Sequence, residues 1–169
     1  MELLGLGCVS SADARLLILG TIPGAESLRQ QAYYSNRRNQ FWRVLFAVLD
    51  ETDPLEYERR LAVVKRHHIA LWDVLEACDR VGSLDSTIAA GTEVVNDIPR
   101  FLRIHSSIRG VALNGAKASA LFHRLVVPRL GDLSKRIRTL DLPSTSPANT
   151  SGVESKISRT SPPSCGRFD

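Results

Sequence analysis

The sequence predicts an α/β protein, a three-layer α/β/α domain built around a central four-stranded parallel sheet. Three observations lead to this prediction. Short, unbroken apolar runs recur along the chain, and such runs are typical of strands that are buried on both faces. Segments with the apolar spacing of amphipathic helices separate these runs. Each run also ends at glycine, proline or a polar residue, so strands and helices alternate as they do when helices connect parallel strands.

The first predicted strand and its loop organise the N-terminal third of the chain, after a lead-in over residues 1–14. Residues 16–19 (Leu-Leu-Ile-Leu) form this strand, and Gly20–Gly24 stop it abruptly. The two glycines permit positive φ angles and let a ligand approach the backbone where no Cβ is present. Apolar residues from Phe41 to Val48 then share one stripe and predict a helix over residues 39–49.

The rest of the chain continues the alternation of helix and strand. Pro54 suits the first position of a second helix that runs to about residue 65, and Asp97 can cap a helix that runs to about residue 106. A third main helix is expected from Ala116 to about Val127, closed by Pro128. The further expected strands cover residues 69–72, 110–113 and 137–142, whereas residues 73–91 carry loop residues around at most one short helix.

Composition favours a single domain in an aqueous compartment. The chain has 169 residues, of which 43% are hydrophobic, and this is sufficient for one substantial core. We expect the domain to cover residues 1–149. Residues 150–169 are serine-rich, contain two adjacent prolines and lack apolar periodicity, so we expect an atypical, disordered tail there. No apolar run approaches the ~20 residues of a membrane span and no signal peptide is recognisable, which predicts a cytoplasmic protein without a membrane partner.

Cysteine spacing and charge narrow the function classes further. Cys8, Cys78 and Cys165 are far apart and lack C-x-x-C spacing, which argues against a disulfide framework, a zinc site or an iron–sulfur cluster. The net charge is +4 and the pI is near 9.2. This mildly basic balance is compatible with a nucleic-acid partner but does not require one.

The loops that follow the strands are the natural place for a binding site. Parallel strands bring their carboxyl ends to one edge of the sheet, where ligands bind in open α/β folds. The loops at that edge are Gly20–Gly24, Trp72-Asp73, Asn114-Gly115 and Pro143–Asn149. The pattern alone therefore predicts one shared pocket without naming its ligand, and Asp73 is a candidate for a secondary polar contact in it.

Four sequence motifs occur in order at these strand ends. They are GTIPG after the first strand, YY upstream of NQFW, NG-x-KA after the third strand, and LPSTSPAN after the fourth. Together they resemble the uracil-DNA glycosylase superfamily, most closely its hypoxanthine-DNA (deoxyinosine) glycosylase branch, over residues 14–149. The resemblance implies a monomer that flips a deaminated base out of DNA and hydrolyses its N-glycosidic bond in base excision repair. It implies no metal, no cofactor and no lyase activity, with hypoxanthine as the preferred base and uracil as a second candidate.

The resemblance also assigns a catalytic residue. Several relatives carry Asp or Asn in the first motif to orient the attacking water, whereas this chain has Thr21 and Ile22 there. In the branch that it resembles, the catalytic Asn matches Asn39, whose side-chain oxygen can hold a water but cannot be a strong base. Considered by itself, Asn39 is also suited to capping the helix that follows it.

The expected base pocket combines the first loop with two side chains. Backbone N–H groups of the loop would stabilise negative charge on the departing base. Tyr34 would stack on that base, and Asn114 would offer a donor and an acceptor to its edge. The residues of this pocket are Gly20, Thr21, Ile22, Pro23, Gly24, Tyr34 and Asn114. If the site binds no ligand, these residues form a tight turn, a polar strand end and an aromatic at a pocket rim. Tyr33 is an alternative to Tyr34 for the stacking role.

The last motif matches the loop with which the family enters DNA. This loop consists of Ser144, Thr145, Ser146, Pro147, Ala148 and Asn149. Taken alone it is a Pro/Ser turn, and the arginines near the first motif (Arg29, Arg37, Arg38 and Arg43) are either phosphate contacts or a solvated face. The family continues with an amphipathic helix, but the residues from Thr150 onward carry too few apolar side chains for one.

Three functions remain to be distinguished. A DNA glycosylase that acts on DNA containing deaminated bases is the leading prediction. The alternative is a catalytically weak or inactive DNA-binding member of the same fold, because the first motif lacks an acidic catalyst and the C-terminus is atypical. A small-molecule hydrolase that uses the same loops is the third. Base release from a duplex separates the first from the second, and salt-dependent duplex binding separates both from the third.

Overall fold

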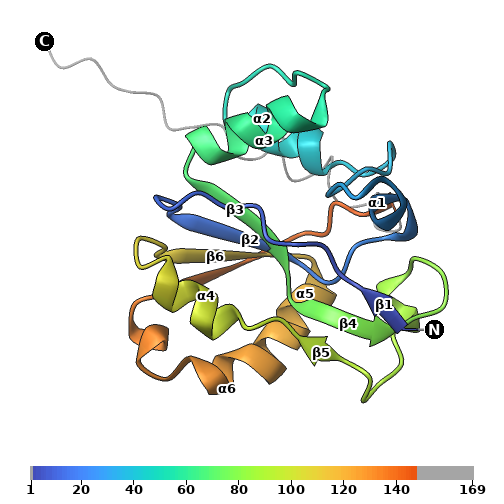
Figure 1. Cartoon of the computed structure of the whole chain (residues 1–169), viewed down its shortest axis with the longest axis vertical. Coiled ribbons are helices and arrows are strands. Elements are labelled where there is room, and N and C mark those ends of the chain that lie inside the picture. Colours follow the sequence, from blue (N-terminus) through green and yellow to red (C-terminus); the bar gives the residue numbers. More distant parts are fainter. Residues whose placement is uncertain (1, 148–169) are drawn as a thin grey trace, which may run out of the picture.

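The computed structural model describes residues 2–147, and its centre is a four-stranded parallel sheet (Figure 1). The strands are β2 (Leu16–Gly20), β3 (Ile69–Asp73), β6 (Gly110–Asn114) and β7 (Arg138–Leu142). Their order is β3-β2-β6-β7, and every neighbouring pair is parallel. The predicted α/β class and the four-stranded parallel sheet are confirmed.

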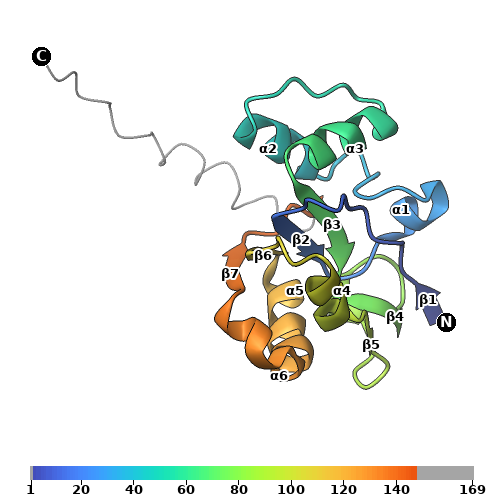
Figure 2. The same ribbon diagram turned by 60° about the vertical axis from the view of Figure 1, so that its left-hand side comes forward.

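Helices cover both faces of this sheet, as predicted (Figures 1 and 2). The chain between β2 and β3 forms α1 (Ala25–Gln30), α2 (Phe41–Val48) and α3 (Tyr57–Arg66). The later connections form α4 (Ile98–Ile104), α5 (Ala116–Leu121) and α6 (Val127–Leu130). Helices α2 and α3 lie on one face, and α4, α5 and α6 lie on the other. Since crossovers between parallel strands are right-handed, the reversal of strand order at β2 sends the two sets to opposite faces.

Side-chain alternation along the buried strands divides the core between these two faces. Leu17 and Leu19 of β2 belong to a cluster with α4, α5 and α6, whereas Ile18 belongs to a cluster with α2 and α3. Successive residues of a strand point to opposite faces, so an unbroken apolar run supplies both clusters at once. The prediction that residues 16–19 are buried on both faces is therefore confirmed.

A second, smaller sheet replaces the loops expected in two places. Strands β1 (Glu2–Leu4), β4 (Leu75–Asp79) and β5 (Val94–Val95) pair antiparallel in the order β1-β4-β5. Only Val74 separates β3 from β4, so one extended stretch leaves the parallel sheet and enters the second one (Figure 1). The lead-in and loop predictions are wrong here. Strands whose partners are this remote in sequence leave a weak local pattern.

The buried stripe of α2 and two helix boundaries also differ from the prediction. Val48 is 77% exposed, so it lies outside the buried stripe that begins at Phe41. Pro54 precedes α3 instead of opening it, because the next residue, Leu55, has a φ of 64°, which is incompatible with a helix. Pro128 does not close the third main helix. A π-helical segment over residues 122–126 precedes it, and Pro128 occupies the first turn of α6.

The remaining expectations concern the helix cap, the short turns and the chain ends. Asp97 accepts a hydrogen bond from the Arg100 N–H (3.2 Å) at the start of α4, as predicted for a cap. Short 3-10 turns cover Asp85–Thr87 and Gly131–Lys135. The expected tail, residues 150–169, lies outside the described residues. No helix within residues 2–147 has the length and apolarity needed to cross a membrane.

Candidate functional site

A pocket of about 590 Å³ opens at the carboxyl edge of the parallel sheet. Its floor lies where β2 sits between β3 and β6, which is where the strand order reverses. Ligands of open α/β sheets bind at such switch points, because the crossovers diverge there and leave a crevice. The lining residues include Gly20–Gly24, Tyr33, Tyr34, Asn39, Asp73, Asp85, Asn114 and residues 144–147. The structure therefore brings the described members of the predicted site together.

Backbone register sets the spacing of the pocket floor. Gly20 of β2 pairs with Asp73 of β3, and Leu19 pairs with Leu113 of β6, which places Asn114 level with Gly20 on the other side. Residues at equal levels of parallel strands point to the same face of the sheet. Asp73 and Asn114 therefore flank Gly20 on the face that α2 covers.

The space above Gly20 is used by two neighbouring side chains. A Cβ added to Gly20 would lie 2.5 Å from Asp73 Oδ1 and 3.3 Å from Tyr34 Oη. Neither Gly20 nor Gly24 has a positive φ, and that of Gly24 is −71°. The predicted conformational reason for the two glycines is therefore wrong. At Gly20 the reason is the close approach of a carboxyl and a hydroxyl group.

Hydrogen bonds from the chain after β3 hold the first loop in place. The Gly20 carbonyl accepts from the Val74 N–H (2.9 Å), and the Thr21 carbonyl accepts from the Leu75 N–H (3.0 Å). These bonds continue the β2–β3 pairing beyond the end of the sheet. In the described part of the chain, the N–H groups of Thr21, Ile22 and Gly24 donate no hydrogen bond, which leaves them available to a ligand.

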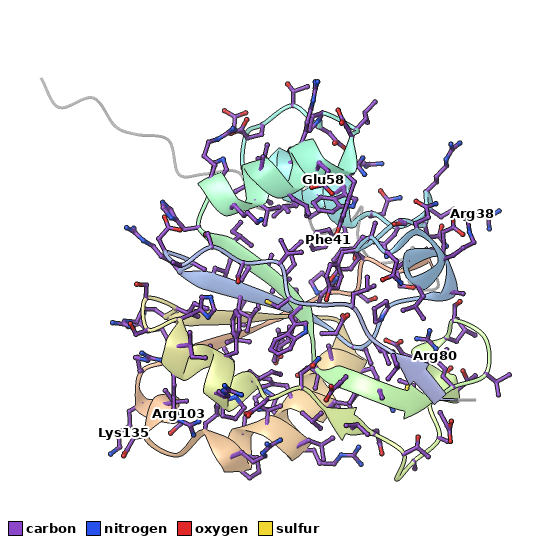
Figure 3. The ribbon with its side chains drawn as sticks, in the orientation of Figure 1. Arg38, Phe41, Glu58, Arg80, Arg103 and Lys135 are labelled. Atoms are coloured by element: carbon purple, nitrogen blue, oxygen red, sulfur yellow. The ribbon has the colours of Figure 1, made fainter. Side chains whose placement is uncertain are left out.

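Arg80 is a structural member of the site that the sequence did not reveal. Its side chain is fully buried beside β4 (Figure 3). Its guanidinium donates to the carbonyls of Pro23 (2.7 Å) and Gly82 (3.1 Å) and lies 3.9 Å from an Asp85 carboxylate oxygen. It thereby ties the first loop to the opposite wall of the pocket. An arginine that will be buried looks the same in a sequence as one on a solvated face.

Asp73 is a buried acid on the pocket floor. The residue is 4% exposed, and its Oδ2 has no hydrogen-bond partner in the described structure. The pKa of Asp73 is raised to about 8, first by burial and then by the nearby Asp85, against the lowering effect of the Arg80 charge. Burial also raises the pKa of Asp85, against the lowering effect of the Thr21 hydroxyl and of the basic groups nearby. The pocket thus contains a carboxyl group that is mostly protonated at neutral pH.

Tyr34 stands between the pocket floor and α2. Its ring stacks on Phe41, with 3.6 Å between the ring centroids, and meets the edge of Trp42 at 6.4 Å. Its hydroxyl accepts a 3.2 Å hydrogen bond from Asn114 Nδ2, and burial raises the pKa of Tyr34. The rival Tyr33 is only 3% exposed, and its hydroxyl donates to two backbone carbonyls of the N-terminal segment. Both tyrosines line the pocket.

Asn39 precedes α2 and lines the same pocket. Its Oδ1 accepts a hydrogen bond from the Phe41 N–H (2.9 Å), and its own N–H donates to the Asn36 carbonyl (2.8 Å). Asn39 therefore satisfies the N–H of the first α2 residue from the position just before the N-cap, Gln40, and is not itself the predicted cap. A carbonyl oxygen has two lone pairs, so this hydrogen bond leaves one acceptor position on Oδ1.

Reciprocal hydrogen bonds join Asn114 to the last loop. Asn114 Nδ2 donates to Thr145 Oγ1 (3.0 Å), and the Thr145 N–H donates to Asn114 Oδ1 (3.2 Å). The Thr145 carbonyl also accepts from the Gln40 N–H (3.0 Å). Residues 144–147 are thus fixed between β6 and the start of α2. The predicted loop continues to Ala148 and Asn149, which lie outside the described residues.

Basic side chains surround the segment that leads to α2. Arg37, Arg38 and Arg43 are exposed, and Arg38 points away from the ribbon (Figure 3). Arg29 is instead paired with Glu26 at 2.6 Å. Within residues 2–147, no group of three or more His, Cys, Asp or Glu side chains is arranged to hold a metal ion.

Known proteins resemble this chain in both sequence and fold. The family model of the uracil DNA glycosylase superfamily matches residues 8–161. A hypoxanthine DNA glycosylase of Methanosarcina acetivorans is 38% identical over 115 residues, which are 68% of this chain and 72% of that protein. A hypoxanthine DNA glycosylase of Methanosarcina barkeri is 34% identical over 119 residues, 70% of this chain and 74% of that protein.

A solved structure shares the fold over nearly the whole chain. It is the solution NMR structure of a candidate uracil DNA glycosylase from Methanosarcina acetivorans. The TM-score is 0.78 at 33% identity, and the match covers 94% of this chain and 93% of that one.

The fold and the pocket together define the class of protein, a small α/β domain with a ligand pocket at the switch point of a parallel sheet. The chain belongs to the uracil DNA glycosylase superfamily. Within that family its sequence is similar to proteins named hypoxanthine DNA glycosylase. The predicted resemblance is confirmed. The family match extends past residue 149, where the sequence placed the end of the domain.

The two loop glycines provide a matched pair for testing the pocket floor. We expect Gly20→Ala to lower the free energy of unfolding by about 1–3 kcal/mol, because the new Cβ overpacks against the Asp73 carboxyl. Gly24→Ala should have little effect, since the nearest atom to its Cβ is 4.0 Å away and its φ suits alanine. Urea unfolding of both variants measures the difference. Equal losses would show that Gly20 does not have to accommodate Asp73.

Proposed function

We propose that this protein is a DNA glycosylase that flips a deaminated base out of DNA and hydrolyses its N-glycosidic bond, with hypoxanthine as the preferred base. The convergence of Asn39, Tyr34 and Asn114 on one pocket carries the proposal, and the names of the curated relatives support it. The pocket volume of about 590 Å³ lies within the range of small-ligand sites. Uracil is the second candidate base, and the enzyme would act as a monomer without lyase activity.

The reaction is a hydrolysis at the sugar carbon. The C1′–N bond breaks and its electron pair leaves with the base, while a water oxygen bonds to C1′. The water releases one proton, and the departing base takes up one proton, so the products are a free neutral base and an abasic sugar. Positive charge on the sugar and negative charge on the base develop together, and preorganised polar groups can stabilise both.

Asn39 is proposed to position the attacking water. The Phe41 N–H already holds Asn39 Oδ1 in a fixed orientation, and the second lone pair of this oxygen is suited to accept from water. A carboxamide is a weak base, so its contribution would be orientation rather than proton removal. The bond from Asn39 to the start of α2 and the catalytic role are therefore compatible.

The other groups of the pocket are proposed to bind the base and stabilise its departure. One face of Tyr34 is occupied by Phe41, which leaves the opposite face for the base. Asn114 is oriented by Tyr34 and Thr145, to which its two N–H groups donate, and its Oδ1 keeps one acceptor position for a base edge. The loop N–H groups of Thr21, Ile22 and Gly24 are candidate donors to negative charge.

DNA duplexes that carry one hypoxanthine, uracil or xanthine test this function directly. The protein is incubated with each duplex, and abasic sites are revealed by alkaline strand cleavage. We expect release of hypoxanthine, and strand breaks only after alkali, because a hydrolase without lyase activity leaves the backbone intact. Salt-dependent duplex binding without base release would instead support the inactive DNA-binding member.

Asn39→Ala tests the positioning of the water. We expect the single-turnover rate of base release to fall by ~10²-fold, while the affinity for the duplex changes little, because one preoriented polar group is lost from the site. Gln40→Ala is the matched control, since the neighbouring Gln40 does not line the pocket. A near-wild-type rate for Asn39→Ala would remove this residue from the mechanism.

Tyr34 variants separate stacking from hydrogen bonding. Tyr34→Phe should be mild, because the ring face remains and Asn114 keeps its bonds to Thr145. Tyr34→Ala should weaken capture of the base by ~1–3 kcal/mol through loss of stacking. Single-turnover rates at increasing enzyme concentration measure both effects. Equal losses in the two variants would contradict the stacking role.

A further inference from the structure

One group on the pocket floor has no part in the reaction described above. Asp73 is nine-tenths or more buried and lines the pocket, yet its Oδ2 makes no hydrogen bond in the described structure. Buried polar atoms without partners are rare, because each sacrifices its hydration without compensation. Such an atom in a ligand pocket points to a partner that arrives with the ligand.

The fold holds this carboxyl group in one place. The Asp73 carbonyl accepts a 2.9 Å hydrogen bond from Asn96 Nδ2, which fixes the backbone where β3 bends toward β4. The missing side chain of Gly20 provides the room for Asp73 Oδ1. On the far side of Gly20, Asn114 occupies the equivalent level of β6. A base that enters between Asp73 and Asn114 would meet a polar group from each neighbouring strand.

The surroundings determine the charge of this group. The ionisable groups that act on Asp73, or on which it acts, are Cys8, Tyr33, Tyr34, Arg80 and Asp85. Among them only Arg80 favours a charged carboxylate. Its Nε and Nη2 donate to the Gly82 and Pro23 carbonyls, whereas its Nη1 has no hydrogen-bond partner in the described structure. Burial is the largest effect, and with Asp85 and Arg80 it results in a pKa of about 8 for Asp73. At neutral pH the group is therefore a carboxylic acid with one O–H to donate.

We propose that Asp73 is a neutral hydrogen-bond donor to the purine in the pocket, directed at the carbonyl oxygen or a ring nitrogen that becomes negative as the C1′–N bond breaks. This inference rests on the proposed glycosylase function and adds a residue to it. Hypoxanthine offers such acceptors at O6, N3 and N7. Asp73 keeps its proton throughout, so the balance of the hydrolysis is unchanged.

The chemistry favours a donor over a base at this position. A neutral acid in a desolvated site strengthens its hydrogen bond as the acceptor gains charge, and a carboxylic acid kept neutral near pH 7 can serve this purpose. An ionised Asp73 would repel the departing anion and would hinder its release. The chain has no carboxylate in the first loop, so stabilisation of the leaving base is the larger need.

Rates of base release as a function of pH test the proposal. Single-turnover release of hypoxanthine from a duplex is measured between about pH 6 and about pH 10 for the wild type, Asp73→Asn and Asp73→Ala. Asp73→Asn retains a donor of the same shape that cannot ionise. Asp132→Asn is the matched control, because Asp132 is exposed and remote from the pocket. The base ionises in the same way for every variant, so ratios of rates isolate the effect of Asp73.

We expect the wild-type rate to fall relative to Asp73→Asn as the pH passes about 8. Asp73→Asn should stay within about tenfold of the wild type at pH 7, and Asp73→Ala should lose ~10²-fold there. Asp132→Asn should follow the wild-type profile. A wild-type rate that rises through pH 8, or an Asp73→Asn variant as slow as Asp73→Ala, would overturn the donor role and indicate a general base or a packing role.

Thermal unfolding gives a second readout that does not depend on activity. The folded protein retains a proton on Asp73 that the unfolded chain releases above its usual pKa of 3.8, so wild-type stability should fall as the pH rises from about 4 to about 8. The melting temperature of Asp73→Asn minus that of the wild type should grow over this window. A constant difference would overturn the proposal. Failure of the wild type to release any base at any pH would overturn the glycosylase function itself, and this inference with it.

Discussion

The parallel register of β2 between β3 and β6 is the constraint on which the rest of the site depends. It places Gly20 level with Asp73 on one side and with Asn114 on the other. A shift of one residue in either pairing would send a polar side chain to the opposite face of the sheet. The bonds from Val74 and Leu75 to the first loop extend this pairing beyond the sheet and fix the loop over the floor. The geometry of the pocket is thus a consequence of ordinary strand pairing.

Hydrogen bonds then connect parts of the chain that are far apart in sequence. Asn114 bonds to Tyr34 and to Thr145, and the Thr145 carbonyl bonds to the first residues of the α2 segment. Stacking of Tyr34 on Phe41 connects the same group of residues to α2 a second time. Each proposed role therefore depends on positions set by the others. Effects of combined substitutions in this network should not add, because neighbouring groups share partners.

The first loop and the floor of the pocket differ in their electrostatic surroundings. The buried Arg80 guanidinium organises the first loop by bonding to carbonyl groups, and Asp73 stays largely neutral on the floor nearby. A neutral acid avoids the large desolvation penalty of a buried carboxylate and keeps a proton for hydrogen bonding. The exposed arginines before α2 lie outside the pocket, where they are available to phosphates. Exposed positive charge therefore lies outside the pocket, and a mostly neutral acid lies on its floor.

Local patterns determined much of this protein from the sequence. The apolar run of residues 16–19 and its counterparts in β3 and β6 predicted the three buried strands, since burial on both faces requires such runs, whereas β7 is an exposed edge strand. The motifs at the strand ends located Asn39, Tyr34, Asn114 and the last loop in one pocket. Only the tertiary structure revealed the second sheet and the buried Arg80. It also showed that Gly20 makes room for Asp73 and that Asp73 is buried enough to stay protonated. These features arise from contacts between remote segments, and neither hydrogen-bond pairing nor desolvation leaves a periodic signal in the chain itself.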